Sequence, residues 1–453
     1  MVTSARRSAW LTDSRRFFYL MTIAFTLWIA APWYVLFVVH AGRQHWISSV
    51  SASAGLSIYA LLALQLTLST RSRVLDSAIG LSSAMSIHRI TGPLIITLIP
   101  GHAIVSFFVY SPFTRSVRVM VPDLIPTVPA IFSVVCIVVA VITGVLRTSA
   151  RFSARMWRKL HAIGYCALPA AMIHGLTSGR MTTHSPALLF HALASTLLPL
   201  GFLAERLYRQ WSSLRNAARV VYVRRDQNAG LVRLCVEPRT LIDFTPGQFC
   251  FLRVPGNDAH PFTIASSQRS RTLVFIARIS GTFTLDLARL KENDPIAIEG
   301  PYGRFSPTHG NATRTDRRVW LAGGIGITPF ISAACAPNAG STTLIWYRHL
   351  ADGIVLRSDL ARAVRTNPGM CITHVVSRAF LHRATPVDSN AFDTMQIVPG
   401  TIIPGNRPLP TLVSMTLRSA FLCGPSELIA RWKMELKQMG VSGRQIHEER
   451  FIL

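Results

Sequence analysis

The sequence predicts an all-helical membrane bundle, followed by an antiparallel β-barrel domain and an α/β domain with a parallel sheet. Three observations lead to this prediction. Long apolar runs are confined to residues 17–207. Apolar residues then alternate with polar ones in short segments after residue 219, as in strands. From about residue 319, strand patterns alternate with helix patterns. The expected domains are residues 1–209, 210–313 and 314–453.

The membrane domain is expected to contain six spans, because apolar stretches of about 20 residues are long enough to cross a bilayer. They are Phe17–Val39, Ile47–Leu68, Ala84–Tyr110, Pro126–Leu146, Leu160–Ser178 and Pro186–Leu203. Lys and Arg gather in the loops on one side, which identifies that side as cytoplasmic. Both termini and the soluble region are therefore expected in the cytoplasm, and the chain in the plasma membrane or a bacterial inner membrane. The run after Arg16 is too long for a cleavable signal peptide.

The positive net charge does not by itself indicate a nucleic-acid-binding protein. The chain has 47 Lys and Arg residues against 21 Asp and Glu residues, a formal net charge of +26. Such an excess is typical of nucleic-acid-binding proteins. Here it is mostly arginine, much of it flanking apolar spans, so it favours membrane orientation and no nucleic-acid partner is expected. The seven cysteines form no CxxC motif, so neither a disulfide framework nor an iron–sulfur cluster is predicted.

Four histidines inside the apolar spans suggest metal binding. They form two pairs, His88 with His161 and His102 with His174. The third and fifth spans run in the same direction, and their histidines are ~21 Å and ~20 Å apart along each span, so the pairs match in depth. Neutral imidazole is a common ligand of haem iron, and polar rings in hydrocarbon are usually functional. Two haems at two levels would let electrons cross the membrane.

The angular positions of these histidines agree less well than their depths. At ~100° per residue, fourteen residues return within about 40° of the starting face, whereas thirteen miss it by about 140°. A kink or wide turn at Pro169, or distortion at Pro93 and Pro100, would correct the mismatch. Helix packing explains any one histidine more simply, but four at matched depths favour ligation. Four other histidines are not expected to bind metal: His40, His45, His184 and His191.

Neighbouring residues of the spans have two interpretations each. Arg89, Arg158 and Lys159 flank the first pair and could bind haem propionates, although membrane anchoring explains them equally well. Ile95 and Leu168 fall midway between the two levels and could line the gap between haems. For either residue alone, plain packing is the simpler interpretation.

The soluble region carries three motifs marked by glycine or proline. The segment His260–Ser267 (HPFTIASS) places an aromatic ring among hydroxyls, which suits a flat ring with polar edges. Gly281–Thr284 opens a helix, an arrangement that favours phosphate but also serves as an ordinary cap. In Val319–Phe330 a strand runs into glycines before a helix begins, which lets the backbone approach a pyrophosphate. Gly300–Gly303 (GPYG) predicts a turn.

The order of HPFT, GPYG, GGIGITPF and CGP along the chain resembles the ferric reductase and NADPH oxidase superfamily, over nearly its whole length. This resemblance implies a six-helix membrane domain in which two b-type haems are ligated by His88, His102, His161 and His174. It also implies a FAD-binding barrel and a Rossmann-like NAD(P)H-binding domain of the ferredoxin–NADP reductase type. NADPH is the expected reductant, and NADH is the alternative.

The resemblance also assigns roles to individual soluble residues. The flavin and its ribityl–phosphate chain would contact His260, Pro261, Phe262, Thr263 and Ser266, and its pyrophosphate would meet Gly281 and Thr284. The nicotinamide dinucleotide would be cradled by Gly323, Gly324, Gly326, Thr328 and Pro329. The motif beside the nicotinamide, where a thiol helps to position hydride transfer, would be Cys423, Gly424 and Pro425. Phe451 would stack on the flavin. The 2′-phosphate would be gripped by Ser377 and Arg378, or by Arg348.

Two departures from the family pattern bear on the electron acceptor. Superoxide-producing members carry a further histidine where this chain has Ser106, and an arginine in the second span, where residues 47–68 contain none. Dedicated oxygen reduction is therefore disfavoured. The expected function is electron transfer from cytoplasmic NAD(P)H through FAD and two haems to an external acceptor, above all a ferric or cupric chelate. Oxygen and a periplasmic redox protein are the alternatives.

Two rival interpretations stay open. One is a transporter with a nucleotide-sensing cytoplasmic domain. Against it, the spans show neither charged ion-relay residues nor paired repeats. The other is a flavoprotein reductase that the helices merely anchor. The sequence leaves the acceptor, the choice between NADPH and NADH, the regulation and the oligomeric state undetermined.

Overall fold

The computed structural model describes residues 22–35, 46–110, 124–147, 154–178, 186–227, 229–268, 270–308, 317–335, 341–348, 356–367, 369–376, 401–404, 417 and 419–449. The chain divides into two compact units, Met1–Tyr208 and Arg209–Leu453. The boundary between them falls within helix α8 (Pro186–Arg215), which contributes residues to both.

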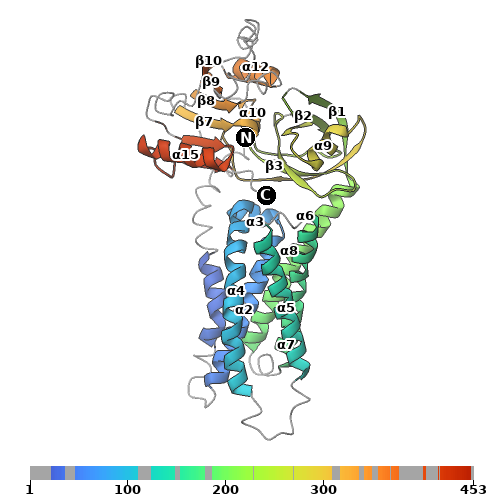
Figure 1. The fold of residues 1–453 in the computed structure, drawn as a ribbon, viewed down its shortest axis with the longest axis vertical. Coiled ribbons are helices and arrows are strands. Elements are labelled where there is room, and N and C mark those ends of the chain that lie inside the picture. Colours follow the sequence, from blue (N-terminus) through green and yellow to red (C-terminus); the bar gives the residue numbers. More distant parts are fainter. Residues whose placement is uncertain are drawn as a thin grey trace. The chain divides into compact units, whose positions relative to one another are not determined.

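The first unit is built from helices (Figure 1). Four of them are long and apolar enough to cross a membrane: α2 (Trp46–Ser69), α4 (Leu81–Tyr110), α5 (Leu124–Leu146) and α8. A shorter apolar helix covers Thr22–Val35, and α3 (Arg73–Ile79) connects α2 to α4. These four helices correspond to four of the six expected spans. Within the described residues, the first and fifth spans are not continuous helices of spanning length, so the six-span prediction is confirmed only in part.

The fifth expected span is divided into three pieces. It consists of α6 (Ala154–His161), the 3₁₀ helix η3 (Ala162–Cys166) and α7 (Ala167–Thr177). Pro169 has no N–H group, so the carbonyl of Tyr165 loses its α-helical partner. Gly164 adds a residue of low helix propensity to the same turn. The chain before Pro169 therefore tightens into a 3₁₀ turn, the form in which carbonyls pair one residue earlier.

Burial identifies α2 as the central helix of this unit. Its side chains from Leu56 to Leu68 are mostly buried, and they form one hydrophobic cluster with residues of α4, α5 and α7. By contrast, α4 leaves large apolar side chains such as Ile90 and Phe108 exposed. Exposed apolar side chains along a long helix suit contact with lipid.

The second unit begins with a closed antiparallel sheet. Its strands are β1 (Ala218–Asp226), β2 (Leu231–Glu237), β3 (Phe249–Arg253), β4 (His260–Thr263), β5 (Leu273–Arg278) and β6 (Pro295–Tyr302), in the order β4-β3-β6-β1-β2-β5. A bridge between Ile264 and Phe275 joins the end of β4 to β5 and closes the sheet. Helix α9 (Thr282–Arg289) packs into the core through Phe283 and Leu287. The expected antiparallel barrel is therefore present.

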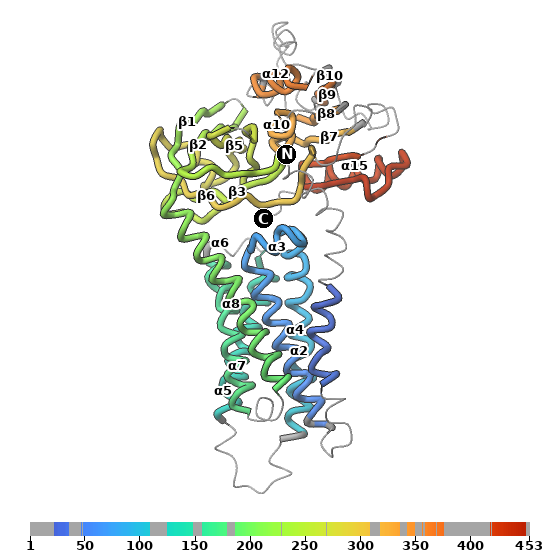
Figure 2. The backbone as a smooth tube through the Cα atoms, turned by 180° about the vertical axis from the view of Figure 1, so that it is seen from behind, coloured from blue at the N-terminus to red at the C-terminus, as the bar shows by residue number. Residues whose placement is uncertain are grey.

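A six-stranded parallel sheet follows, and four of its strands, β7 to β10, are labelled next to one another in Figure 2. The strands are β7 (Arg317–Gly323), β8 (Ser341–Arg348), β9 (Met370–Val376), β10 (Thr401–Pro404), β11 (Ser419–Cys423) and β12 (Ile446–Glu449). Their order is β10-β9-β8-β7-β11-β12, so the winding direction changes between β7 and β11. Open parallel sheets bind ligands at the carboxyl ends of the strands beside such a switch point.

Helices cover both faces of this sheet. On one face Trp320 and Trp346 pack with η4 (Gly324–Ile327), α10 (Thr328–Ala334) and α12 (Arg357–Thr366). On the other, Val319 and Leu321 pack with α15 (Ser426–Gln438). Neighbouring residues of β7 thus enter opposite cores, which explains why this strand reads as a continuous apolar run.

Candidate functional site

The four histidines of the apolar spans meet in two pairs inside the helical unit. The ring centroids of His88 and His161 lie 6.1 Å apart, and those of His102 and His174 lie 6.4 Å apart. The ring planes cross at 68° in the first pair and 78° in the second. In each pair, one ring comes from α4, and its partner comes from the segment formed by α6, η3 and α7.

Helix α2 orients the two rings of α4. His88 Nδ1 lies 3.3 Å from the backbone oxygen of Gln65, and His102 Nδ1 lies 3.0 Å from that of Ser51. A carbonyl oxygen only accepts, so each Nδ1 must carry the proton and each Nε2 must keep its lone pair. Within the described ranges, no hydrogen bond reaches either Nε2. This is the arrangement of a histidine prepared to bind a metal through Nε2.

Helix α5 orients the opposing two rings in the same way. His161 Nδ1 and His174 Nδ1 each lie 2.8 Å from a backbone oxygen, of Ala140 and Pro126 respectively. Pro126 and Ala140 have the same spacing along α5 as Ser51 and Gln65 have along α2. The two supporting helices thus present carbonyls at two matching levels, so all four imidazoles carry their proton on Nδ1.

The distance within each pair suits one metal ion between two imidazoles. A metal lies about 2.0 Å from a ligating ring nitrogen, and that nitrogen lies about 1.1 Å from the centroid of its ring. Two imidazoles on opposite sides of one metal therefore have their ring centroids roughly 6 Å apart. The separations of 6.1 Å and 6.4 Å agree with this value. A metal with only two protein ligands must take the others from elsewhere, as haem iron does from its porphyrin.

The 3₁₀ helix η3 removes the angular mismatch expected between His161 and His174. A 3₁₀ helix turns ~120° per residue, where an α-helix turns ~100°. The five residues of η3 therefore add about 100° of rotation. This brings His174 within roughly 40° of the face of His161, the same offset that fourteen α-helical residues give on α4. The segment also lengthens, to about 22 Å against about 21 Å on α4.

Two glycines to which the sequence assigned no role make room for the imidazoles. A Cβ atom on Gly55 would lie 2.9 Å from Cε1 of His102, and one on Gly144 would lie 3.6 Å from Cε1 of His161. Each glycine stands one helical turn after the carbonyl that accepts from that histidine, so both features share one helix face. These glycines could have been recognised from the sequence, because each is a small residue in the second or fourth span at the depth of a histidine.

The side chains around the two pairs are mainly apolar. Ile95 and Leu168 are buried in one hydrophobic cluster. Arg89, beside the first pair, is exposed, and its Nε donates to the carbonyl of Met85 at 3.3 Å. The hydroxyl of Ser106 lies 2.6 Å from that of Ser51, the residue whose carbonyl orients His102.

His191 of α8 serves helix packing. Its Nε2 donates to the carbonyl of Trp28 at 3.0 Å, and its ring stacks on that indole with centroids 4.6 Å apart. Pro32 lacks the N–H that would otherwise satisfy this carbonyl, so His191 replaces a lost helical bond. The other three histidines given no ligand role, His40, His45 and His184, lie outside the described residues.

The HPFT motif forms β4 and packs beneath the start of α9. Phe283 places its ring centroid 4.3 Å from that of His260 and 5.8 Å from that of Phe262. Beyond the strand, the hydroxyl oxygen of Ser266 is buried and has no hydrogen-bond partner in the described part of the chain. A buried polar group without a partner costs about 1–3 kcal/mol. A ligand with polar edges, such as the ribityl–phosphate part of a flavin, would satisfy this hydroxyl.

The start of α9 leaves its N-terminus accessible. The Thr284 hydroxyl accepts from the N–H groups of Ser280 (3.0 Å) and Gly281 (3.1 Å), and donates to the carbonyl of Gly281 (2.9 Å). This side chain therefore caps its own helix. Within the described residues, no atom lies within 4 Å of the point where a Cβ of Gly281 would stand. The positive end of the helix dipole can thus be approached closely by an anion.

The glycine-rich loops after β7 and β11 interlock at the switch point. A Cβ on Gly323 would lie 2.9 Å from Cδ of Pro425, and one on Gly326 would collide with the carbonyl of Cys423. A Cβ on Gly424 would lie 3.0 Å from Cα of Gly323. These positions need glycine because two backbones meet there. The structure thus brings together the two motifs that the sequence assigns to the dinucleotide.

The remaining residues of the GGIGITPF motif start α10. Gly324 has φ +53°, which favours glycine, and no atom in the described part lies within 4 Å of the place of its Cβ. Thr328 and Pro329 are buried in the first turn of α10, where the Thr328 hydroxyl donates to the carbonyl of Ile325 at 3.1 Å. Because the described residues leave the place of a Gly324 Cβ open, a phosphate could approach the backbone there.

Burial determines the chemistry of two further expected site residues. Burial, together with the negative charge of Glu449, raises the pKa of the Cys423 thiol well above its ordinary value, so the thiol is neutral.

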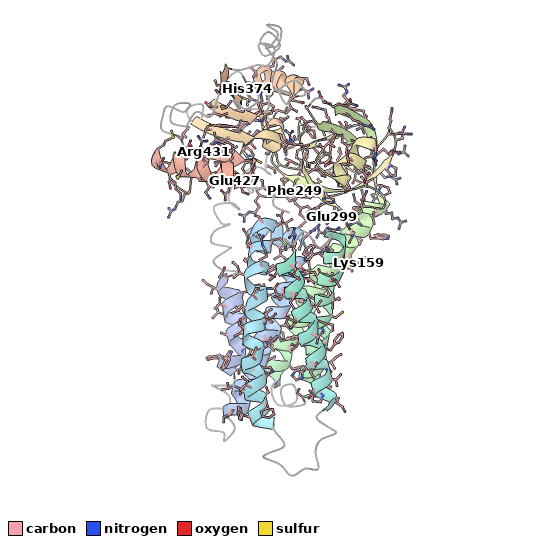
Figure 3. The ribbon with its side chains drawn as sticks, viewed as in Figure 1. Lys159, Phe249, Glu299, His374, Glu427 and Arg431 are labelled. Atoms are coloured by element: carbon pink, nitrogen blue, oxygen red, sulfur yellow. The ribbon has the colours of Figure 1, made fainter. Side chains whose placement is uncertain are left out.

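Arg348 is also buried. Its Nε donates to Nδ1 of His374 at 3.0 Å (His374 is labelled in Figure 3), and its guanidinium lies over the ring of Trp346. Ser377, Arg378 and Phe451 lie outside the described residues.

Two buried polar contacts connect the barrel to the parallel sheet. The Ser332 hydroxyl of α10 donates to the carbonyl of Ser266 at 2.8 Å. Arg233 of β2 forms a two-pronged ion pair with Asp359 of α12, in which Nη2 lies 3.0 Å from Oδ1. Both contacts lie within the second compact unit. They hold the segment after HPFT and the helices of the parallel sheet in a fixed relation.

Comparison with known proteins matches both units. Residues 54–172 match a family model described as ferric reductase like transmembrane component, and residues 217–306 match one described as FAD-binding domain. The probable dihydroorotate dehydrogenase B (NAD(+)), electron transfer subunit, of Thermococcus kodakarensis is 30% identical over 218 residues, covering 47% of this chain and 75% of that protein. The chain spans only 44% and 32% of the proteins of that name from Pyrococcus furiosus and Methanocaldococcus jannaschii.

Two further similarities concern parts of the chain. Ferric reduction oxidase 5 of Arabidopsis thaliana is 35% identical over 100 residues, which are 20% of this chain and 14% of that protein. The crystal structure of a ferredoxin NADP+ reductase from Neisseria gonorrhoeae with bound FAD and NADP aligns with 20% identity and a TM-score of 0.41, covering 52% of this chain and 98% of that one.

Proposed function

We propose that this chain, which belongs to the ferric reductase and NADPH oxidase superfamily, passes electrons from cytoplasmic NAD(P)H through FAD and two b-type haems to an acceptor on the other side of the membrane. The chain is an integral membrane oxidoreductase that binds FAD and NAD(P). The observation that carries the proposal is the geometry of the two imidazole pairs, in which all four rings are tied through Nδ1 and spaced for a metal between them.

The four histidines would hold the two haems through Nε2. His88 and His161 would hold one and His102 and His174 the other. When bound, haem iron supplies one-electron chemistry, and the flavin divides the two electrons of a hydride. The carbonyls of α2 and α5 keep each imidazole in the tautomer that presents Nε2. Between the two levels, buried Ile95 and Leu168 exclude water from the path.

We assign hydride entry to the second unit, with FAD in residues 210–313 and NAD(P)H in residues 314–453. His260, Pro261, Phe262, Thr263 and Ser266 would line the flavin, and the N-terminus of α9 at Gly281 and Thr284 would face its pyrophosphate. The dinucleotide would lie across the switch point, on the loops of Gly323 and Cys423. A neutral thiol at Cys423 is suited to packing beside the nicotinamide, while Phe451 would cover the flavin. NADPH is the proposed reductant, through Ser377, Arg378 or Arg348.

The acceptor that the chain supports best is a ferric or cupric chelate. Superoxide-producing members of the superfamily carry an imidazole where this chain has Ser106. Here the Ser106 hydroxyl is occupied by the Ser51 hydroxyl, 2.6 Å away, so no imidazole is available there to receive oxygen. The ferric reduction oxidase of Arabidopsis thaliana is named for ferric reduction, which agrees with this choice.

The proposal is tested with the purified full-length protein in liposomes that contain Fe(III)–citrate. NADPH added on the flavin side should reduce haem in a stopped-flow trace and then form Fe(II) inside the vesicles. H102L should abolish internal Fe(II) but retain reduction of ferricyanide on the flavin side. A transporter would give no haem band, and an anchored reductase would be unaffected by H102L. If superoxide were the only product, the acceptor would be oxygen and not a metal chelate.

A further inference from the structure

We propose that Gly164 and Tyr165 are positioning residues that hold η3 in its 3₁₀ form and thereby set the register between His161 and His174. This inference rests on the function proposed above, because it concerns the same two imidazole pairs. It goes further by identifying which side chains impose the unusual local winding.

Helix α5 shows why the winding matters. It contacts the fifth span at three evenly spaced points: Pro126 with His174, Ser133 with Ala167, and Ala140 with His161. Successive points on α5 are about two helical turns apart, a spacing that returns within about 20° of the same face. On the fifth span the upper interval, from Ala167 to His174, has the same length as on α5, so no adjustment is needed there.

The lower interval, from Ala167 back to His161, is shorter by one position than its counterpart on α5. Six α-helical residues would miss the α5 face by about 120°. With the five residues of η3 wound at ~120°, the same interval returns within about 20° of that face. The contact between His161 and the Ala140 carbonyl therefore requires the 3₁₀ form.

Gly164 allows η3 to lie against α5. A Cβ atom at this position would stand 2.9 Å from the Cβ of Ala140, closer than two such atoms approach in proteins. Ala140 is also the residue whose carbonyl accepts from His161. Any side chain at position 164 would thus push the segment away from the acceptor that orients this histidine.

Tyr165 ties the other side of η3 to α2. Its hydroxyl lies 2.9 Å from the hydroxyl of Ser69, whose own proton is donated to the carbonyl of Leu66 at 2.7 Å. The tyrosine is therefore the donor. Because 3₁₀ helices have poorer hydrogen-bond geometry than α-helices, such a segment needs outside contacts to persist. Gly164 and Tyr165 supply them toward α5 and α2, the two helices that orient all four histidines.

The test uses the full-length protein purified from haem-replete cells. Haem per chain is measured together with the low-spin electron paramagnetic resonance signals of the ferric protein. G164A should lose the haem held by His88 and His161 and retain the other. G175A is the matched control, because within the described residues no atom lies within 4 Å of a Cβ placed there, next to His174. It should keep both haems and both signals.

A second substitution separates positioning from misfolding. A140G removes the atom with which an alanine at position 164 would collide, so G164A/A140G should regain the missing haem and its signal. Y165F should shift the signal of the same haem only. S69A should have the same effect, and the S69A/Y165F double variant should add nothing to either alone.

Two results would overturn the inference while leaving the proposed function intact: a G164A protein with two haems and unchanged signals, or a G164A/A140G protein that stays deficient. A wild-type protein that is folded and flavin-loaded but lacks haem would instead refute the proposed function, and this would be evident before any variant is examined.

Discussion

The side-chain hydroxyl of Ser332 donates a hydrogen bond of 2.8 Å to the backbone carbonyl of Ser266. Ser332 lies in α10, the helix that follows the GGIG loop, and Ser266 lies just after the HPFT strand. Both residues are buried. The bond uses the carbonyl of Ser266 and leaves its hydroxyl available to a ligand. One buried contact thus couples the flavin motif to the dinucleotide motif.

We expect S332A to weaken FAD binding several-fold and to lower kcat for hydride transfer more than it changes KM for NADPH. A buried neutral hydrogen bond contributes about 1 kcal/mol, and its loss frees the segment that carries Ser266. FAD affinity is measured by flavin fluorescence and turnover by NADPH-dependent ferricyanide reduction. N367A is the control, because Asn367 donates to the carbonyl of Ala334, two residues after Ser332 in the same helix, a bond that does not involve the segment that carries Ser266. Equal effects of S332A and N367A would contradict the coupling.

Gly55 and Gly144 should respond differently to the same substitution. G55A places a Cβ 2.9 Å from His102, so the imidazole must move and the haem of that pair should be lost or its midpoint potential changed. G144A places a Cβ 3.6 Å from His161, an ordinary van der Waals contact, and should be tolerated. Redox titration of the haem absorbance distinguishes the two. If both variants lost haem or changed its midpoint potential, or if both matched the wild type, clearance around the rings would not control binding.

The ion pair between Arg233 and Asp359 should stabilise the second unit against unfolding. The side chains are 16% and 5% exposed, so D359N leaves a largely buried guanidinium without its charge partner. Breaking such a pair costs about 3–5 kcal/mol. We expect an earlier thermal transition of flavin fluorescence in D359N, with partial recovery in R233M/D359L. As a comparison, R289M removes the exposed guanidinium that pairs with Asp286 and should have little effect.

Local patterns predicted much of this fold, because long apolar helices and parallel strands carry their burial in the sequence. The winding of η3 could not be predicted in this way. A short segment of 3₁₀ helix and one of α-helix can have the same composition. We attribute the difference here to the carbonyl freed by Pro169 and to the contacts of Gly164 and Tyr165 with other helices. The correction was expected as a kink or wide turn at Pro169, or as distortion at Pro93 and Pro100, whereas the 3₁₀ winding lies in residues 162–166.

The candidate site shows the same limit. Residue type and order were enough to single out the histidines and the glycine motifs. By contrast, the clearance at Gly55 and the bond from Ser332 to Ser266 join residues that are far apart in the chain. Such relations follow from the packing of helices and sheets, and a single sequence contains no periodic signal for them. The count of six spans is confirmed for four long helices, and the fifth expected span consists of α6, η3 and α7 rather than one α-helix.

Cys423 should resist alkylation under conditions in which exposed cysteines react. Burial, reinforced by Glu449, raises the pKa of its thiol, so the reactive thiolate stays scarce as the pH rises through the ordinary titration range of cysteine. Cys371 of the second unit is exposed and provides an internal control. After iodoacetamide treatment of the folded protein at mildly alkaline pH, mass spectrometry should find Cys371 modified and Cys423 intact. The folded state favours the neutral thiol, and this preference stabilises the fold. The stabilisation is complete at pH values below the pKa of the unfolded thiol, and it decreases as the pH rises above that value. Rapid modification of Cys423 in the folded protein would show that the thiol is accessible and ionised, and would remove the basis for a neutral thiol beside the nicotinamide.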